Sequence, residues 1–388
     1  MRVGIISNSI ETGGAQRVCL KMLEALKEAG YEVSLITLKK PDWFTVERMF
    51  GSIVKPDQEI VLLKWNFPAF DAYKPLFAAI LIPSVAKKFK LDLLINSQGD
   101  TLPVRANIIY VHYPTFSEYE HASINLKYSR SLFWRIYIAP YKLIHRFFKK
   151  YLESGLIVTN GIYSKRAIKK HIGKEPFVLT PPVGTEAFNA VASSLERENI
   201  VVTCGRYSPE KNYETMLRVA KDLSETDFKV VGSYSGEKSS RYYKKLSSLK
   251  SNENLLNVSL LRDLSFCNLL ELYSKSKVYL HTMKDEHFGI AIVEAMAAGL
   301  VPVVFKTGGP WEDILKTRQG YYGFSYKNAN EAANIIKMIL SNENLRKKIS
   351  ERNVIYVKNF SDTLFKEKFS RIVKNIISGN ANGQGINT

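Results

Sequence analysis

The sequence has few cysteines for its length. Only three occur among 388 residues, Cys19, Cys204 and Cys267, and they lie far apart without a CxxC spacing. A disulfide framework and a structural zinc site both need cysteines in closer, paired spacings. The cysteine content therefore argues against both and predicts a protein of a reducing compartment.

Long hydrophobic runs are also missing. The longest apolar stretch, residues 75–86, contains Pro83, and it is shorter than the roughly 18 residues expected of a spanning helix. Residues 1–7 resemble a strand, because their apolar run is too short for a signal peptide and no small-residue cleavage site follows. We expect no segment that crosses a membrane.

Acidic residues are the third shortage. Lys and Arg number 55 against 37 Asp and Glu, which gives a net charge of +18. Such an excess indicates a partner of opposite sign, and nucleic acid, anionic lipid and phosphorylated metabolites all qualify. The apolar content of 45% and charged content of 24% are typical of a globular protein, so we expect disorder only in the tail, residues 379–388.

The sequence does contain an alternation of short β-branched runs with amphipathic helical stretches, which indicates parallel sheets covered by helices. The predicted strands are 2–7, 32–38, 59–64, 92–96, 107–112 and 155–160, then, after a proline-marked break at 180–189, 199–205, 228–232, 257–261, 278–282 and 301–305.

This pattern and the length of the chain predict an α/β fold with two doubly wound, Rossmann-like domains. The first is expected at residues 1–185 and the second at 186–360, with a C-terminal helix at 361–378 that crosses back to the first. In such folds, ligands bind beyond the carboxyl ends of the strands. We therefore expect the site in a cleft between the two domains.

Two features of the first domain lie where a ligand would bind. Gly13 and Gly14 follow the first strand and precede a helix, so backbone amides could approach a phosphate, although a simple turn has the same pattern. His112 ends the strand at 107–112. A histidine there can hydrogen-bond a phosphate or a hydroxyl, and a buried structural histidine is the alternative.

Two cations follow the first strand of the second domain. Arg206 and Lys211 lie on the loop between that strand and a helix predicted at about 212–224. Together they could hold a diphosphate, Arg by its fork of donors and Lys as a point charge. The alternative is that both are solvated loop charges, and their spacing does not decide between these interpretations.

Two carboxylates, Glu286 and Glu294, lie eight positions apart around a Phe-Gly pair. Because Gly289 disfavours a helix interior, we expect the helix to begin near Ile290, with Glu286 in the preceding mobile loop and Glu294 in the first turns. This arrangement suits a ligand at a helix N-terminus. An exposed loop acid and a helix acid favoured by the macrodipole are the alternatives.

Residues 127–151 are rich in Lys, Arg and aromatic residues and contain no acid. Such a stretch could lie on an anionic membrane surface or contact a lipid acceptor, bind single-stranded nucleic acid, or pack on its own domain. The residues that would contact the membrane or acceptor are Trp134, Arg135, Lys142, Arg146, Lys149 and Lys150.

The order of these features resembles the retaining glycosyltransferase family 4 over nearly the whole chain. The motifs that carry the resemblance are Gly-Gly after the first strand, "VHYPT" at 111–115, "GRYSPEKN" at 205–212, "DEHFGIAIVEAMAAGLVPVV" at 285–304 and "TGGPWEDI" at 307–314. Glu286 and Glu294 match the E-x7-E signature of that family. The resemblance implies a GT-B fold, a nucleotide-sugar donor bound by the second domain, an acceptor bound by the first, and no metal.

The resemblance also implies roles for individual residues. Arg206 and Lys211 would hold the donor diphosphate, Glu294 would accept the ribose hydroxyls, and Glu286 would contact the transferred sugar. The implied catalytic residues are His112, which would reach the reacting sugar, together with Arg206, Lys211 and Glu286. The implied donor-binding residues are Gly14, which would lie by the phosphate, and Arg206, Lys211, Glu286, His287, Phe288, Gly289, Ile290 and Glu294.

The motifs look most like those of mannosyltransferases that extend lipid-linked oligosaccharides. The implied partners are GDP-mannose, a dolichol- or polyprenyl-linked glycan, and an anionic membrane that the protein contacts peripherally on its cytoplasmic face. A UDP-sugar-dependent transferase for surface polysaccharide or glycolipid remains an alternative, as does a basic nucleic-acid-binding protein. An inactive scaffold is disfavoured because every expected donor residue is present.

Overall fold

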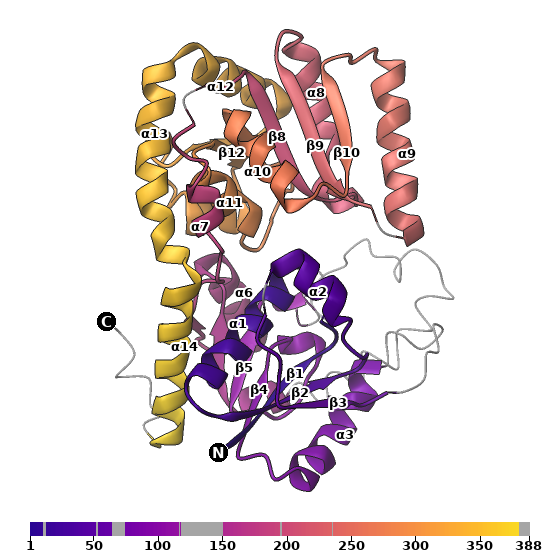
Figure 1. Ribbon diagram of the computed structural model, residues 1–388, viewed down its shortest axis with the longest axis vertical. Helices are drawn as coiled ribbons and strands as arrows, with labels where there is room; N and C mark the ends of the chain where they lie inside the picture. Colours follow the sequence, from indigo (N-terminus) through magenta and orange to yellow (C-terminus); the bar gives the residue numbers. More distant parts are fainter. Residues whose placement is uncertain are drawn as a thin grey trace. The chain divides into compact units, whose positions relative to one another are not determined.

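The computed structural model describes residues 1–10, 13–51, 53–63, 74–115, 117, 150–194, 196–234 and 236–379. It divides into two compact units (Figure 1). The first comprises Met1–Pro182 and Asp362–Thr388, and the second comprises Val183–Ser361. The predicted tail, 379–388, lies outside the described residues except for Gly379.

The first unit contains a seven-stranded sheet in the order β3-β2-β1-β4-β5-β6-β7. Every pairing is parallel, and Ile5 at the centre lies opposite Leu35 on one side and Ile95 on the other. The strands are β1 (Arg2–Ser7), β2 (Glu32–Thr37), β3 (Gln58–Val61), β4 (Leu93–Asn96), β5 (Ile108–Val111), β6 (Leu156–Thr159) and β7 (Phe177–Val178). Their β-branched residues pack on both faces, which is typical of a parallel sheet covered by helices.

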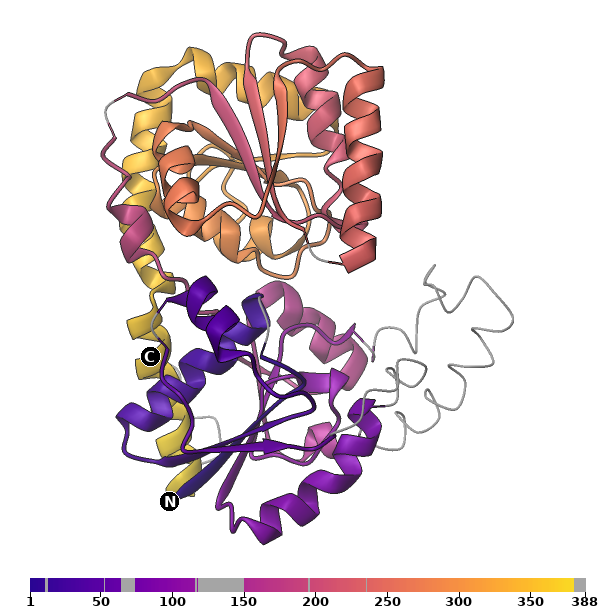
Figure 2. The same cartoon turned by 45° about the vertical axis from the view of Figure 1, so that its right-hand side comes forward.

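The described helices of the first unit are α1 (Gly14–Glu28), α2 (Trp43–Phe50), α3 (Lys74–Lys88), α6 (Ile162–Ile172) and α14 (Asp362–Ile377). The C-terminal helix α14 returns to this unit because Phe365 and Phe369 join the same apolar cluster as α1. Charged pairs reinforce the contact: Arg17 Nη2 lies 2.9 Å from both carboxylate oxygens of Asp362. Figures 1 and 2 show α14 alongside α1.

The second unit repeats the pattern with six parallel strands in the order β10-β9-β8-β11-β12-β13. The strands are β8 (Ile200–Arg206), β9 (Asp227–Ser233), β10 (Val258–Arg262), β11 (Val278–Leu280), β12 (Val301–Phe305) and β13 (Phe324–Tyr326). The helices are α7 (Glu186–Asn189), α8 (Glu214–Asp222), α9 (Gly236–Asn252), α10 (Phe266–Lys275), α11 (Ile290–Ala297), α12 (Ala329–Ser341) and α13 (Glu343–Tyr356).

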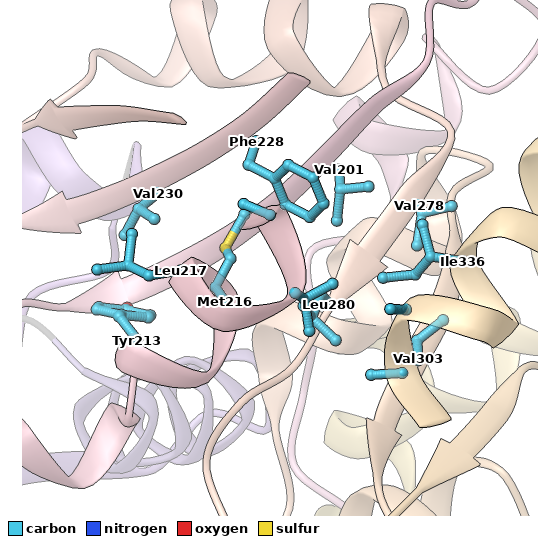
Figure 3. Packing of buried hydrophobic residues seen from close by; sticks show 14 of the residues in the cluster. Val201, Tyr213, Met216, Leu217, Phe228, Val230, Val278, Leu280, Val303 and Ile336 are labelled. Atoms are coloured by element: carbon cyan, nitrogen blue, oxygen red, sulfur yellow. The ribbon is translucent and has the colours of Figure 1, made fainter. Parts of the chain in front are cut away.

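Helices α8 and α12 bury their apolar faces against this second sheet (Figure 3). Met216 and Leu217 of α8 and Ile336 of α12 contact the buried face built from strand residues such as Val201 and Val303. Fully burying a side chain of this size contributes about 1.5–3 kcal/mol relative to leaving it exposed. The core therefore fixes the strands whose ends form the site.

One half-buried guanidinium joins three helix ends in the second unit. Arg197 donates hydrogen bonds to carbonyl oxygens of Tyr273 and Ser276 at the end of α10, and of Ala298 at the end of α11. It also bonds two carbonyls that follow α7. A cation is favourable where helix carbonyls would otherwise lack donors. Arg197 therefore helps to hold α11 in place.

The structure adds two strands that the sequence pattern does not predict, β7 and β13. They have two and three residues, too few for an alternation to be recognised. No helix in the described ranges combines the length and the apolar content needed to cross a membrane.

Candidate functional site

The candidate site lies where the strand order of the second unit reverses. From β8 the chain proceeds outward through β9 and β10, and then returns to β11 on the other side of β8. In doubly wound sheets, this reversal leaves a crevice beyond the carboxyl ends of the two central strands. Lys211 follows β8, and His281, Thr282 and Met283 follow β11.

Hydrogen bonds join the segments that follow β8 and β11. A 3₁₀ helix, Pro209–Lys211, ends at Asn212, whose φ of 50° turns the chain into α8. The Asn212 amide donates to the Thr282 carbonyl at 3.3 Å, and the Thr282 hydroxyl donates to the Lys211 carbonyl at 2.6 Å. The backbone of Lys211 is thus fixed to the end of the neighbouring strand.

Lys211 and Glu286 form an ion pair. Nζ lies 2.6 Å from Oε2, and the two side chains are 19% and 16% exposed. Burial acts to raise the pKa of Glu286, but the charge of Lys211, the neighbouring His281 and the hydrogen bond from Lys211 outweigh it and lower the pKa to about 2. The carboxylate of Glu286 is therefore ionised at neutral pH.

His281 lies beside this pair and is neutral. Burial lowers its pKa to about 4, with Glu286 opposing that shift and Lys211 adding to it. Nε2 is buried, has no hydrogen-bond partner among the residues that the structure describes, and lies 3.7 Å from Glu286 Oε2. Because the ring is neutral, this proximity is not an ion pair, and the distance exceeds that of a hydrogen bond. A small movement of the carboxylate would allow Nε2–H to donate to it.

The loop that carries Glu286 is held by a second glycine-rich turn. The Gly309 amide donates to the Glu286 carbonyl at 2.8 Å. Gly308 has a φ of +82°, and a Cβ there would lie 2.6 Å from that carbonyl oxygen. Only glycine permits this conformation and this approach without strain. The Gly-Gly pair of "TGGPWEDI" therefore fixes the position of Glu286, in a loop that the sequence led us to expect as mobile.

The remaining residues of the acidic motif lie around α11, which begins at Ile290 as predicted. Gly289 caps the helix with a φ of 100°, and Phe288 is buried and packs edge-on against Phe360 at 5.8 Å. His287 and Ile290 are half-buried. Gly289 has no side chain with which to cap the helix, and the Ile292 amide in the first turn donates to the Gly289 carbonyl at 3.0 Å.

Glu294 lies on α11 close to the end of β8. It is half-buried. Burial raises the pKa of the Cys204 thiol to about 12, and the negative charge of Glu294 contributes to that shift. The structure therefore places Glu294 near the strand end that leads to Lys211. The two acids of the motif both belong to the second unit.

The two predicted cations differ. Arg206 is the last residue of β8, and its side chain is 68% exposed and lies 3.4 Å from Glu210. Lys211 instead points into the buried cluster with Glu286 and Met283. The structure thus brings Lys211 and Glu286 together and leaves Arg206 at the surface.

Gly14 and His112 belong to the first unit. Gly14 is the first residue of α1, which has no acidic residue in its first turn and no side-chain cap. His112 follows β5, and its Nε2 donates to the Ser97 carbonyl at 3.2 Å. Its ring lies 4.8 Å from that of Tyr110.

Comparison with known proteins identifies the family of this site. Residues 185–354 match the family described as Glycosyl transferases group 1, and these residues include Lys211, Glu286 and Glu294. The chain is a glycosyltransferase. Nucleotide sugars are the donors of such enzymes. Among the residues that the structure describes, no group of three or more His, Cys, Asp or Glu could hold a metal ion.

The relatives and the fold agree with this family. A Dictyostelium discoideum protein named GDP-Man:Man(3)GlcNAc(2)-PP-Dol alpha-1,2-mannosyltransferase is 25% identical over 89% of this chain and 72% of its own length. A human protein of the same name is 26% identical over 74% of this chain and 65% of its own length. The sucrose-phosphate synthase structure from Thermosynechococcus elongatus has a TM-score of 0.78 at 16% identity and covers 97% of this chain and 99% of that one. The glycosyltransferase therefore has a GT-B fold, with two parallel-sheet α/β domains.

The residues predicted to contact a membrane or acceptor are outside the described part of the glycosyltransferase, with one exception. Trp134, Arg135, Lys142, Arg146 and Lys149 lie in the undescribed range 118–149. Lys150 is described and exposed, in the 3₁₀ helix Lys150–Glu153, with its Nζ 5.7 Å from the Tyr151 ring.

Sequence reasoning missed His281 as a site residue of the glycosyltransferase. It was included only as part of the predicted strand 278–282, where an apolar run favours a core position. The signal that selected His112, a histidine at the carboxyl end of a central strand, also applies to His281. Applied to both units, that signal would have found it.

Proposed function

We propose that this glycosyltransferase moves mannose from GDP-mannose, with retention of configuration, onto a lipid-linked oligosaccharide at the cytoplasmic face of a membrane, forming an α-1,2 linkage. The names of its relatives support the donor, the acceptor and the linkage. The observation that carries the proposal is the Lys211–Glu286 pair at the strand reversal within the matched family region.

The proposed roles follow from the charges at this site. Lys211, with Arg206, would neutralise the donor diphosphate, the group that gains charge as the bond to the sugar breaks. Glu294 would accept the ribose hydroxyls. The diphosphate would compete with Glu286 for Lys211, and Glu286 would then turn to the sugar hydroxyls. His281 Nε2, now 3.7 Å away, would donate a hydrogen bond to the carboxylate that Lys211 leaves.

The reaction breaks the bond between sugar C1 and the diphosphate oxygen and forms a bond from C1 to the acceptor oxygen on the same face. The acceptor hydroxyl proton passes to the departing phosphate oxygen. The barrier is mainly the separation of charge between an oxocarbenium-like sugar and the diphosphate, so fixed cations are the main catalytic contribution. We therefore assign no nucleophile to Glu286. His112 would contact the reacting sugar from the first unit, and Gly14 would approach a phosphate.

The proposal is tested by thermal unfolding with GDP, UDP, ADP and their mannose or glucose conjugates. A ligand at a hundredfold excess over its Kd stabilises the folded protein by about 2.7 kcal/mol. We expect shifts with GDP and GDP-mannose alone, which Glu294→Ala abolishes. A shift with UDP compounds instead would replace the donor with a UDP-sugar, and the absence of any shift would contradict the function.

A further inference from the structure

Helix α3 of the first unit has two apolar faces. Its inner face packs Ala78, Ala79 and Ile82 into the cluster beneath the sheet. On the opposite side, Phe77, Ile80 and Leu81 are exposed, in a pattern typical of one face of a helix. Soluble proteins rarely leave several large apolar side chains together in water without a function.

The outer face of α3 continues into a cationic end. Ser84, Lys87 and Lys88 are exposed at the next positions of the same helical face. Residues 74–90 contain four lysines, Lys74, Lys87, Lys88 and Lys90, and no acid. On a helix at the periphery of its unit (Figure 1), exposed apolar side chains followed by lysines can contact the acyl boundary and the acidic headgroups of a membrane.

We propose that the outer face of α3 binds an anionic lipid surface, with Phe77, Ile80 and Leu81 entering the headgroup boundary and Lys87 and Lys88 contacting acidic headgroups. Charge complementarity selects this partner, because a lysine-only end is attracted to anionic lipid and a second copy of the same face would be repelled. The inference deepens the proposed function, on which it rests, by naming the surface that meets the membrane. This helix is separate from the basic aromatic stretch at 127–151.

The test measures binding of the full chain to phosphatidylcholine vesicles with and without phosphatidylglycerol. Wild type is expected to prefer the anionic vesicles. We expect Phe77→Ser/Ile80→Ser/Leu81→Ser to weaken binding by at least about tenfold. Lys87→Glu/Lys88→Glu is expected to weaken binding to anionic vesicles by at least about tenfold and to leave binding to neutral vesicles unchanged.

Matched controls separate this face from general effects. Phe44→Ser removes an exposed phenylalanine of α2 in the same unit, and Lys347→Glu/Lys348→Glu reverses an exposed lysine pair on α13. Both controls should bind vesicles like wild type. The nucleotide-induced shift in melting temperature is measured on every variant, so loss of donor binding, which tests the proposed function, is distinguished from loss of membrane binding.

Three outcomes would overturn the inference. One is unchanged vesicle binding by the triple serine variant. Another is a wild-type dimer that the triple variant dissociates without a change in vesicle binding, which would assign the face to a second copy. The third is that the triple variant melts at a lower temperature than wild type, Phe44→Ser does not, and vesicle binding is again unchanged. That result would show that the face packs against other parts of the same chain.

Discussion

The two sheets share the order of six strands, to which the first sheet adds β7, but the residues at the two order reversals differ. At the end of β8 and β11, Lys211 and Glu286 form a buried ion pair. At the end of β1 and β4, the side chains bonded to one another are amides and hydroxyls: Gln98 Nε2 donates to Ser7 Oγ at 3.0 Å, and Asn8 Nδ2 lies 3.4 Å from Gln98 Oε1.

In folds of this kind, topology decides where a ligand binds and the residues there decide which ligand it is. A fixed cation suits a diphosphate, whereas amides and hydroxyls suit the hydroxyl groups of a sugar. The second unit is accordingly the donor unit in the proposed function. In that same proposal the first unit binds the acceptor.

The largest effect is expected from Lys211→Met. Transfer should fall by about 10²–10³-fold because the diphosphate loses its buried cation. Folding should also lose about 3–5 kcal/mol, because Glu286 stays buried without its partner. Initial rates and urea unfolding measure the two effects.

The double variant Lys211→Met/Glu286→Gln is the control for that prediction. It should recover most of the lost stability, since no uncompensated charge remains, and none of the activity. If the double variant were as unstable as Lys211→Met, the unpaired charge of Glu286 would not be the cause of the instability.

His281 sharpens the account of the charged site. With His281→Leu, we expect kcat to fall by about 10–100-fold, the value of one hydrogen bond to a charged group. Binding of GDP alone should be unchanged, because His281 acts through Glu286 on the sugar. His281→Gln, which can still donate, should retain most of the activity. An equal loss of GDP binding in both variants would indicate a merely structural role.

Gln98 tests the group of amides and hydroxyls at the strand reversal of the first unit. Gln98→Ala removes one amide from the hydrogen-bonded group there, and we expect KM for the glycan acceptor to rise by about 3–10-fold. Donor affinity should not change. A weaker affinity for GDP-mannose, with KM for the acceptor unaltered, would reverse the assignment of the two units.

The pH dependence of stability has two windows. The pKa of His281 is lowered from 6.5 to about 4, so the unfolded chain binds more protons between these values and stability falls as pH falls from 6.5 to 4. His281→Gln should remove that part of the loss. The pKa of Glu286 is lowered from 4.5 to about 2. Its contribution is complete above pH 4.5 and disappears as pH falls through 2, and urea unfolding of Glu286→Gln and wild type measures it.

The sequence predicts the parts of this protein that depend on long patterns. The alternation of strand and helix patterns predicts the two parallel sheets, and Gly289 predicts that α11 begins at Ile290. Strands β7 and β13 have too few residues to produce a pattern, and tertiary pairing alone defines them.

Individual site residues are predicted less completely, because burial is not visible in spacing. Arg206 and Lys211 are alike in sequence, but one is exposed and the other lies in a buried ion pair. The contact between Lys211 and Glu286 joins residues 75 positions apart, and the Gly308–Glu286 approach depends on a backbone turn. Neither follows from local periodicity.

The most direct test is the affinity for GDP-mannose of three proteins, measured by calorimetry: wild type, Lys211→Met/Glu286→Gln and Gln98→Ala. The ion pair of Lys211 and Glu286, at the point where the strand order of the second unit reverses, should hold the donor. The double variant should therefore lose about a hundredfold or more in affinity, while Gln98→Ala stays within about twofold of wild type. Undiminished affinity in the double variant, or a large loss in Gln98→Ala, would contradict the account.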